Sequence, residues 1–363
     1  MKAKTLQEVD LSSVIAVNDQ WWRGELGRPV FNIVCTGAEP TLPVSRLEPR
    51  SFIPEYPRDA APADIIDAEY FKLSSRRYIG DGFPLQWMNF GPGVLAALVG
   101  GTGHAGKDTV WFEPGQFAGL PLSGMRIVFD PRSDWALWLT ELYHEQLSRL
   151  DKQPLIPGMT DLGGVLDILA TLRNSEALML DLLDDPAEVK RLTGEEQAAR
   201  AVAYDHFDTM IRARALVSSC WAGLLSSGTC DMLQSDFSYM ISPAMFCEFV
   251  RPRLEENCVR LAHPFYHLDG KGELPHLPHL LTIPNLRGIQ WVPGTGQPPQ
   301  SEWPEVFEAV ESAGLKMQLL GSLDSCEAVL RRLKNPSLAH VWLEIRPHEL
   351  ERACRLVAEF GGS

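Results

Sequence analysis

Short apolar runs alternate with helical segments throughout the second half of the chain. Each run has the length and the flanking turn residues of a buried strand, and a segment with helical periodicity follows it. The strands are expected over residues 229–236, 263–269, 286–294, 315–321 and 339–345. Alternation of this kind is typical of parallel strands joined by right-handed helical crossovers. The sequence therefore predicts an α/β fold with a parallel sheet.

Further strand–helix units precede these. Residues 153–172 show the same pattern, and residues 84–100 form another candidate unit. So many units in one chain favour a closed (β/α)8 barrel, the TIM barrel, with an open doubly wound sheet as the alternative. We expect one domain over residues 1–363 with an N-terminal extension. Residues 109–145 do not fit the repeat and are expected to form a β-rich insertion that ends in an amphipathic helix.

The charge and the cysteine content of the chain argue against several classes of protein. A formal net charge of −14 over 363 residues opposes general nucleic-acid binding, which requires clustered Lys and Arg. No apolar run approaches the roughly 20 residues of a membrane span, and the N-terminus shows no apolar signal segment. The seven cysteines are widely spaced without a CxxC pair, which suits a reducing compartment. We therefore expect a cytoplasmic protein that binds neither nucleic acid nor membranes.

A glycine-rich stretch in the first half has a misleading spacing. Residues 101–108, GTGHAGKD, fit the Gly and Lys positions of a phosphate-binding P-loop. Asp108 stands where a P-loop has Ser or Thr to hold magnesium, and an aspartate there repels phosphate. We expect a flexible glycine-rich loop rather than a nucleotide site.

A histidine and an aspartate stand two residues apart at the end of one predicted strand. In the stretch FYHLDGKGELPHL (265–277), His267 and Asp269 fall where the apolar run gives way to Gly270. Residues i and i+2 of a strand point to the same face, so both side chains should aim at one point beyond the strand end. Catalytic groups of (β/α)8 barrels lie at the C-terminal ends of the strands. The residues at corresponding positions in other units are Asp161, Asp236, Trp291, Ser322 with Asp324, and Glu344.

Most of these residues also have a simple structural interpretation. Asp and Ser at strand ends are frequent helix N-caps, an alternative that applies to Asp269 and Asp324. Capping explains Asp236 less well, because a loop separates it from the next helix. Glu is a poor N-cap, so the alternative for Glu344 is a salt bridge with Arg346 or another cation at the rim.

Histidine and carboxylate side chains together suit two kinds of chemistry. They bind a divalent metal ion through imidazole nitrogen and carboxylate oxygen and leave a position open for substrate. They also form an acid–base set, in which neighbouring carboxylates raise the histidine pKa. The spacing in the sequence does not separate these alternatives.

Several passages resemble the uroporphyrinogen decarboxylase superfamily, which includes cobalamin-related methyltransferases and has (β/α)8 barrels. The resemblance extends over most of the chain from about residue 20 and is strongest over residues 229–294, which contain the pattern SP-x-MF-x-EF. It implies the barrel fold and a homodimer. The similar passages are QWWRGELGRPVF (20–31), LRNSEALMLDLLDDPAEV (172–189), SDFSYMISPAMFCEFVRP (235–252), YHLDGKGELPHLPHLLTIPNLRGIQWVPG (266–294) and GSLD (321–324).

The chain departs from both branches of this superfamily. True uroporphyrinogen decarboxylases carry an RQAGR substrate loop, and the nearest stretch here, SRRYIGDG (75–82), lacks that pattern. The methyltransferase branch binds zinc through His-x-Cys and a later Cys. His267 matches the histidine, Asp269 takes the place of the first cysteine, and Glu344 lies near where the last would fall. Carboxylates make a harder metal centre than thiolates, one suited to polarising an ether or alcohol oxygen rather than a thiol.

The leading hypothesis is a methyltransferase that acts on a small methylated O- or N-compound and passes the methyl group to a corrinoid protein. His267, Asp269 and Glu344 would hold or polarise the substrate, directly or through zinc, with Asp236 as a further catalytic residue. The corrinoid would be carried by a separate partner, because this chain has no DxHxxG cobalamin motif. The residues expected to bind substrate are Asp161, Trp291, Trp87, Asn89 and Ser322.

Two alternatives belong to other classes. The first is a cofactor-free decarboxylase or other lyase of the same superfamily, with Asp236 and His267 as acid and base on a small carboxylate substrate. The second is a binding protein that kept the barrel without its chemistry. Zinc content separates these alternatives from the leading hypothesis, since neither of them requires zinc.

Overall fold

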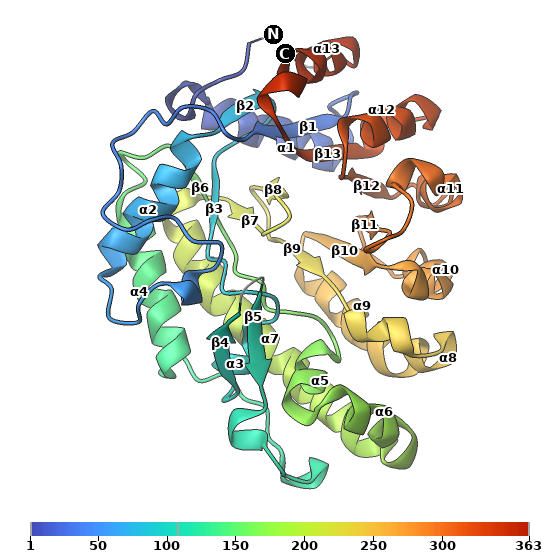
Figure 1. Cartoon of the computed structure of the whole chain (residues 1–363). Helices are drawn as coiled ribbons and strands as arrows, with labels where there is room; N and C mark the ends of the chain where they lie inside the picture. The colour runs from blue at the N-terminus through green and yellow to red at the C-terminus, as the bar shows by residue number, and fades with distance from the viewer. Residues whose placement is uncertain (1, 107–108, 362–363) are drawn as a thin grey trace.

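Seven strands form the central sheet of the molecule (Figure 1). The computed structural model describes residues 2–106 and 109–361. Every neighbouring pair of strands in this sheet is parallel except β1 with β2. In sheet order the strands are β2 (Arg77–Gly80), β1 (Val30–Cys35), β13 (Ala339–Ile345), β12 (Lys316–Leu319), β11 (Gly288–Val292), β10 (His263–Asp269) and β9 (Cys230–Leu233).

Strands β9 to β13 are the five strands that the sequence alternation predicts, and their parallel pairing confirms the α/β fold. Figure 1 shows them side by side, with the crossover helices on one side of them. The segments of this half are η5 (Asp236–Met240), α8 (Pro243–Met245), η6 (Phe246–Val250), α9 (Arg251–Arg260), η7 (Lys271–His276), α10 (Leu277–Leu280), η8 (Gln300–Glu302), α11 (Pro304–Ser312), α12 (Leu323–Arg332), η9 (Pro336–Leu338), η10 (Pro347–Glu349) and α13 (Leu350–Glu359).

One turn of π-helix interrupts the helix that follows β9. In this turn, η6, the N–H of Arg251 donates to the carbonyl of Phe246, five residues back. Pro252 follows directly; it has no N–H for the usual bond to residue 248, and its ring crowds that carbonyl. The widened turn accommodates the proline, and the helix continues as α9.

The first half of the chain extends the sheet through short strand pairs. Strand β3 (Leu85–Trp87) pairs in parallel with β6 (Ile156–Gly158), and β7 (Ser218–Ser219) pairs with β8 (Leu225–Ser226). A bridge between Met159 and Cys220 links the ends of β6 and β7, and the Ser218 hydroxyl donates to the Cys230 carbonyl of β9 at 3.3 Å. Where a closed barrel is expected, the structure has a seven-stranded sheet with short strand pairs beside it. No continuous backbone ladder runs through all these strands within the described residues.

The helices of the first half surround these short strands. The longest, α7, spans Pro186–Ala215. None of the described helices is long and apolar enough to cross a membrane. The others are η1 (Leu6–Glu8), α1 (Leu11–Arg23), η2 (Ile53–Glu55), α2 (Pro62–Ser74), α3 (Leu95–Leu98), α4 (Asp134–Ser148), α5 (Asp167–Arg173) and α6 (Ser175–Asp184).

The insertion expected over residues 109–145 is β-rich only at its start. Its one strand, β5 (Val110–Glu113), pairs antiparallel with β4 (Thr102–Ala105). Two 3-10 turns, η3 (Gly115–Phe117) and η4 (Leu122–Gly124), lead to the expected helix α4. The glycine-rich stretch 101–108 is therefore a strand for half its length rather than a loop, while Lys107 and Asp108 lie outside the described residues.

The two faces of strands β10 to β13 differ in polarity. The side chains that face the crossover helices are apolar and belong to the main core: Leu268, Ile289, Trp291, Met317, Leu319 and Val341. Successive residues of a strand point to opposite faces, so the residues between them point away from the helices. On that inner face four polar side chains stand in register across four strands: His267, Gln290, Gln318 and His340.

Candidate metal centre

Three ionisable side chains converge where strands β9 and β10 end. Asp236, His267 and Asp269 each offer one ligand atom, and these atoms all lie within 4.8 Å of one another. His267 and Asp269 share one face of β10, as the sequence predicts, and Asp236 opens η5 just after the neighbouring strand β9. Within residues 2–106 and 109–361 this is the one group of three such residues close enough to hold a metal ion.

The donor set fits a divalent metal ion. One imidazole nitrogen and two carboxylate oxygens are hard or intermediate ligands of the kind that zinc binds, and three protein ligands leave a coordination position for substrate. The Nδ1 atom of His267 contacts Oε1 of Gln290, which leaves Nε2 as the nitrogen available to a metal. Ligating histidines characteristically use their second nitrogen in this way.

Asp167 holds the turn that presents Asp236. Its Oδ2 accepts the backbone N–H of Asp236 at 3.1 Å, and its Oδ1 accepts that of Phe237 at 2.8 Å. Gly164 makes room for this carboxylate: a Cβ there would lie 2.3 Å from Oδ2 of Asp167 and 2.2 Å from the carbonyl of Gln234. The start of α5 is thereby joined to the start of η5 directly beside the cluster.

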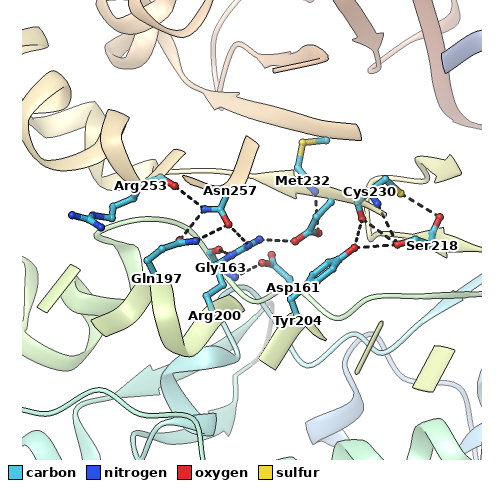
Figure 2. Close-up of polar contacts among 11 residues, drawn as sticks. Asp161, Gly163, Gln197, Arg200, Tyr204, Ser218, Cys230, Met232, Arg253 and Asn257 are labelled. Atoms are coloured by element: carbon cyan, nitrogen blue, oxygen red, sulfur yellow. Dashed lines mark hydrogen bonds and ion pairs between the residues drawn. The ribbon is translucent and has the colours of Figure 1, made fainter. Parts of the chain in front are cut away.

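A buried network anchors the loop that carries Asp161, as Figure 2 shows. Oδ1 of Asp161 accepts the Gly163 N–H at 2.7 Å, which closes a tight turn after β6. Arg200 of α7 donates to the Gly163 carbonyl at 3.3 Å and to Asp231 of β9 at 2.5 Å, and Asn257 of α9 accepts from the same guanidinium at 3.2 Å. The loop is therefore tied to two helices and a strand.

The region around the cluster carries excess negative charge. Burial raises the pKa of Asp161 to about 6, with further contributions from the charges of Asp231 and Asp236. The surrounding protein atoms also raise the pKa of Asp236, although its carboxylate is open to solvent; His267 lowers this pKa and Asp269 raises it. Burial, and then the charge of Asp236, raises the pKa of Asp167 well above its usual value. A bound cation would relieve this repulsion.

A cavity of about 870 Å³ opens beside the cluster, and Asp236 forms part of its wall. Apolar, acidic and neutral polar side chains line it. The apolar ones include Trp111, Phe112, Phe237 and Ile168, and the acidic ones are Glu113, Asp167, Glu176 and Asp236. No Lys, Arg or His is present among the described residues of this lining. A second cavity of about 430 Å³ borders Asp269, so the cluster touches both.

The structure does not bring Glu344 into the three-residue cluster. Glu344 lies at the end of β13 on the same face as His340 and Trp342, but it is exposed, and its Oε1 lies 3.6 Å from Nη2 of Arg76. A salt bridge at the rim is the alternative interpretation of this residue. Asp236 occupies the third position of the cluster instead.

The predicted substrate-binding residues are dispersed. Trp291 is buried on the helix side of β11, where its ring packs edge-on against Trp303 with centroids 5.4 Å apart. Trp87 is half-buried on β3, and the amide of Asn89 binds the Ser51 carbonyl at 2.9 Å. Ser322 lines the second cavity and also caps α12, accepting the Ser325 N–H at 3.2 Å.

Sequence reasoning missed Asp167 and Gln290. Asp167 lies inside the predicted strand–helix unit 153–172, three residues after Gly164, and no pattern in the sequence singles it out. Gln290 lies inside the apolar run GIQWV, and a buried amide in such a run is a detectable signal, because an amide without a partner is costly to bury.

The fold has a relative among solved structures. No family model and no curated protein sequence matches the chain. A methyltransferase from Methanosarcina mazei is 14% identical, covers 95% of this chain and 97% of its own, and superposes with a TM-score of 0.58. At this level of identity the similarity shows a shared fold, and it extends over nearly the whole of both chains.

Proposed function

We propose that this protein is a methyltransferase that demethylates a small methylated O- or N-compound, on a (β/α)8-type scaffold, and passes the methyl group to a separate corrinoid protein. Asp236, His267 and Asp269 would hold a divalent metal ion, with zinc as the first candidate. When bound there, the ion would supply Lewis acidity toward the atom that carries the methyl group. The observation that carries this proposal is a three-ligand cluster beside an open cavity, to whose wall Asp236 contributes together with apolar and further acidic side chains.

The residues around the cluster suit the departure of an alcohol or amine. When the methyl group leaves, the oxygen or nitrogen keeps the bonding electron pair and takes up a proton. Asp161 does not line the cavity, but it interacts electrostatically with Asp236 and His267, and burial raises its pKa to about 6, so it would hold a proton in part of the population near neutral pH. Trp111 and Phe112 on the β4–β5 hairpin, together with Phe237, would offer apolar surface to the organic part of the donor.

The alternative lyase is less well supported. Arg and Lys are the side chains that bind a substrate carboxylate most strongly, and the described lining of the large cavity has acidic residues instead. A carboxylate placed beside Asp167 and Asp236 would be repelled.

Metal analysis and a demethylation assay test the proposed function together. The purified protein should bind one zinc ion, and Asp236→Asn should weaken that binding at least tenfold, because an amide is a poorer ligand than a carboxylate. Glu344→Gln is the matched control, since Glu344 lies outside the cluster, and it should bind zinc like the wild type. With reduced cobalamin as acceptor, methoxyarenes and methylated amines should yield methylcobalamin.

Two results would contradict the proposal. A wild-type protein that binds no divalent metal would remove the metal centre. A metal-loaded protein that transfers no methyl group from any of these donors, yet releases carbon dioxide from a carboxylate substrate, would establish the lyase instead.

A further inference from the structure

We propose that Gln290 and Gln318 are positioning residues that fix the tautomer of the neutral His267 ring. Nδ1 then carries the proton, and Nε2 presents its lone pair to the metal. This inference rests on the proposed function, because it assigns these residues a role toward the metal centre. It is carried by an unbroken line of hydrogen bonds across strands β10 to β13.

The strand register brings the members of this line together. His267 stands opposite Gln290, Gln290 opposite Gln318, and Gln318 opposite His340. Both glutamines and His340 are at most 1% exposed, so water does not satisfy their polar atoms. The Nε2 of Gln290 donates to Oε1 of Gln318 at 2.5 Å, and Oε1 of Gln290 contacts Nδ1 of His267.

A backbone carbonyl fixes the direction of the whole line. The side-chain nitrogen of Gln318 lies 2.8 Å from the carbonyl oxygen of Ala222, which can only accept a hydrogen bond. The amide nitrogen of Gln318 must therefore face Ala222, and its oxygen must face Gln290. A flipped amide would set two acceptors against each other.

The direction of the hydrogen bonds at Gln318 also determines the direction at His267. Because Oε1 of Gln318 accepts, Nε2 of Gln290 donates, and Oε1 of Gln290 is left to face the imidazole. An amide oxygen only accepts, so Nδ1 of His267 must donate and carries the proton. In the neutral ring Nε2 is then unprotonated, which is the form that binds a metal. Trp221, edge-on to the ring at 5.5 Å between centroids, restricts its rotation.

The remaining hydrogen of the Gln318 amide completes the arrangement. It points to Nδ1 of His340 at 3.2 Å, which makes that nitrogen the acceptor. Each amide of the line therefore uses its oxygen toward His267 and its nitrogen away from it. In the opposite direction the amide nitrogen of Gln290 would donate to Nδ1 of His267 and leave the ring proton on Nε2. Only the observed direction leaves Nε2 free.

The test compares glutamine variants with a matched buried glutamine elsewhere. Gln290→Leu removes the acceptor and should weaken zinc binding by about 10–100-fold. Gln146→Leu is the control: Gln146 is equally buried and donates to Oε1 of Gln86 at 2.9 Å, and neither of its hydrogen bonds goes to a residue of the cluster. It should destabilise the fold comparably without changing zinc affinity.

A conservative variant and a spectroscopic readout separate positioning from packing. In Gln290→Glu a protonated carboxyl accepts from Nδ1 of His267 and donates to Gln318, so zinc affinity should return to within about threefold of the wild type. Imidazole ¹⁵N spectra of the metal-free wild type should show His267 protonated at Nδ1, and Gln290→Leu should show a mixture of tautomers.

Each outcome decides the proposal. Zinc affinity of Gln290→Leu within about twofold of the wild type, or equal losses in Gln146→Leu, would overturn it. So would a wild-type His267 protonated at Nε2. The ¹⁵N measurement needs neither metal nor a variant, so it decides the inference even if Gln290→Leu does not fold. A wild type that binds no zinc would end the proposed function, while the tautomer would still decide the hydrogen-bond direction.

Discussion

Asp167 accepts the backbone N–H of Asp236 at 3.1 Å, so one carboxylate at the start of α5 holds another at the edge of the cavity. Both side chains line that cavity, and the charge of Asp236, after burial, raises the pKa of Asp167. The contact joins two segments that are far apart in the chain.

Asp167→Asn should disturb the cluster without removing a ligand. Asn keeps only one acceptor oxygen, so one of the two N–H groups at Asp236 and Phe237 loses its partner, at a cost of about 1–3 kcal/mol. Zinc affinity should fall about tenfold, as competition with a chelator would show. Glu176→Gln, on the same cavity wall, is the control and should change little. Unaltered affinity in Asp167→Asn would show that the turn holds Asp236 by itself.

Arg200→Met should destabilise the fold strongly. The substitution leaves Asp231 buried and without its cation, which costs about 3–5 kcal/mol. Urea unfolding should show this loss, and the double variant with Asp231→Leu should recover most of it. Arg331→Met breaks an exposed pair with Glu359 and should have little effect. If the double variant were as unstable as Arg200→Met, the hydrogen bonds to Gly163 and Asn257 would be the larger contribution.

His340 should make the protein less stable in mild acid. Burial lowers its pKa to about 4, whereas an unfolded histidine titrates near 6.5. The stability from this group is complete above about pH 6.5 and is lost as the pH falls toward 4, because only the unfolded chain takes up the proton there. The loss reaches about 3 kcal/mol over this range.

The matched variant for this pH dependence is His340→Gln. Its unfolding free energy should fall less between pH 6.5 and pH 4 than that of the wild type. Burial raises the pKa values of Asp161 and Asp208 to about 6, and these groups act in the opposite sense in both proteins. The difference between the two proteins therefore isolates His340. Parallel curves would mean that the buried imidazole is protonated without cost.

The large cavity should select donors by charge. Methyl donors that carry an ammonium group, or no charge, should bind at least tenfold more tightly than matched donors that carry a carboxylate, because the described lining holds four acids. Calorimetry on the zinc-loaded protein measures this ratio. Glu113→Gln combined with Glu176→Gln should narrow it. Tighter binding of the carboxylate member would favour the lyase.

The sequence predicted the parallel strands and the pairing of His267 with Asp269 because both depend on local periodicity. Apolar runs of strand length identify β9 to β13, and a spacing of two residues is enough to place both side chains on one face. The placement of Asp236 near the site also depended only on where its own strand ends. These features do not depend on how distant segments meet.

Glu344 and Trp291 show where the sequence was not sufficient. The side chain of Glu344 points to the face that the alternation along its strand predicts. Its partner Arg76, beside β2, lies within reach only because β2 pairs antiparallel with β1. In the run GIQWV, either Gln290 or Trp291 had to face inward. The helix-covered face is the apolar one, so the tryptophan lies there and the amide faces inward. That choice depends on which face the helices cover.

The line of hydrogen-bonded side chains across strands β10 to β13 makes the state of His267 depend on the register of the strands. Within the sheet each glutamine contacts the residues opposite it, so a strand that slips by one residue turns its amide to the helix side and brings an apolar side chain in its place. A mispaired sheet could still be compact, yet His267 would lose its acceptor. Metal binding would then differ between correctly assembled molecules and compact ones with a shifted strand.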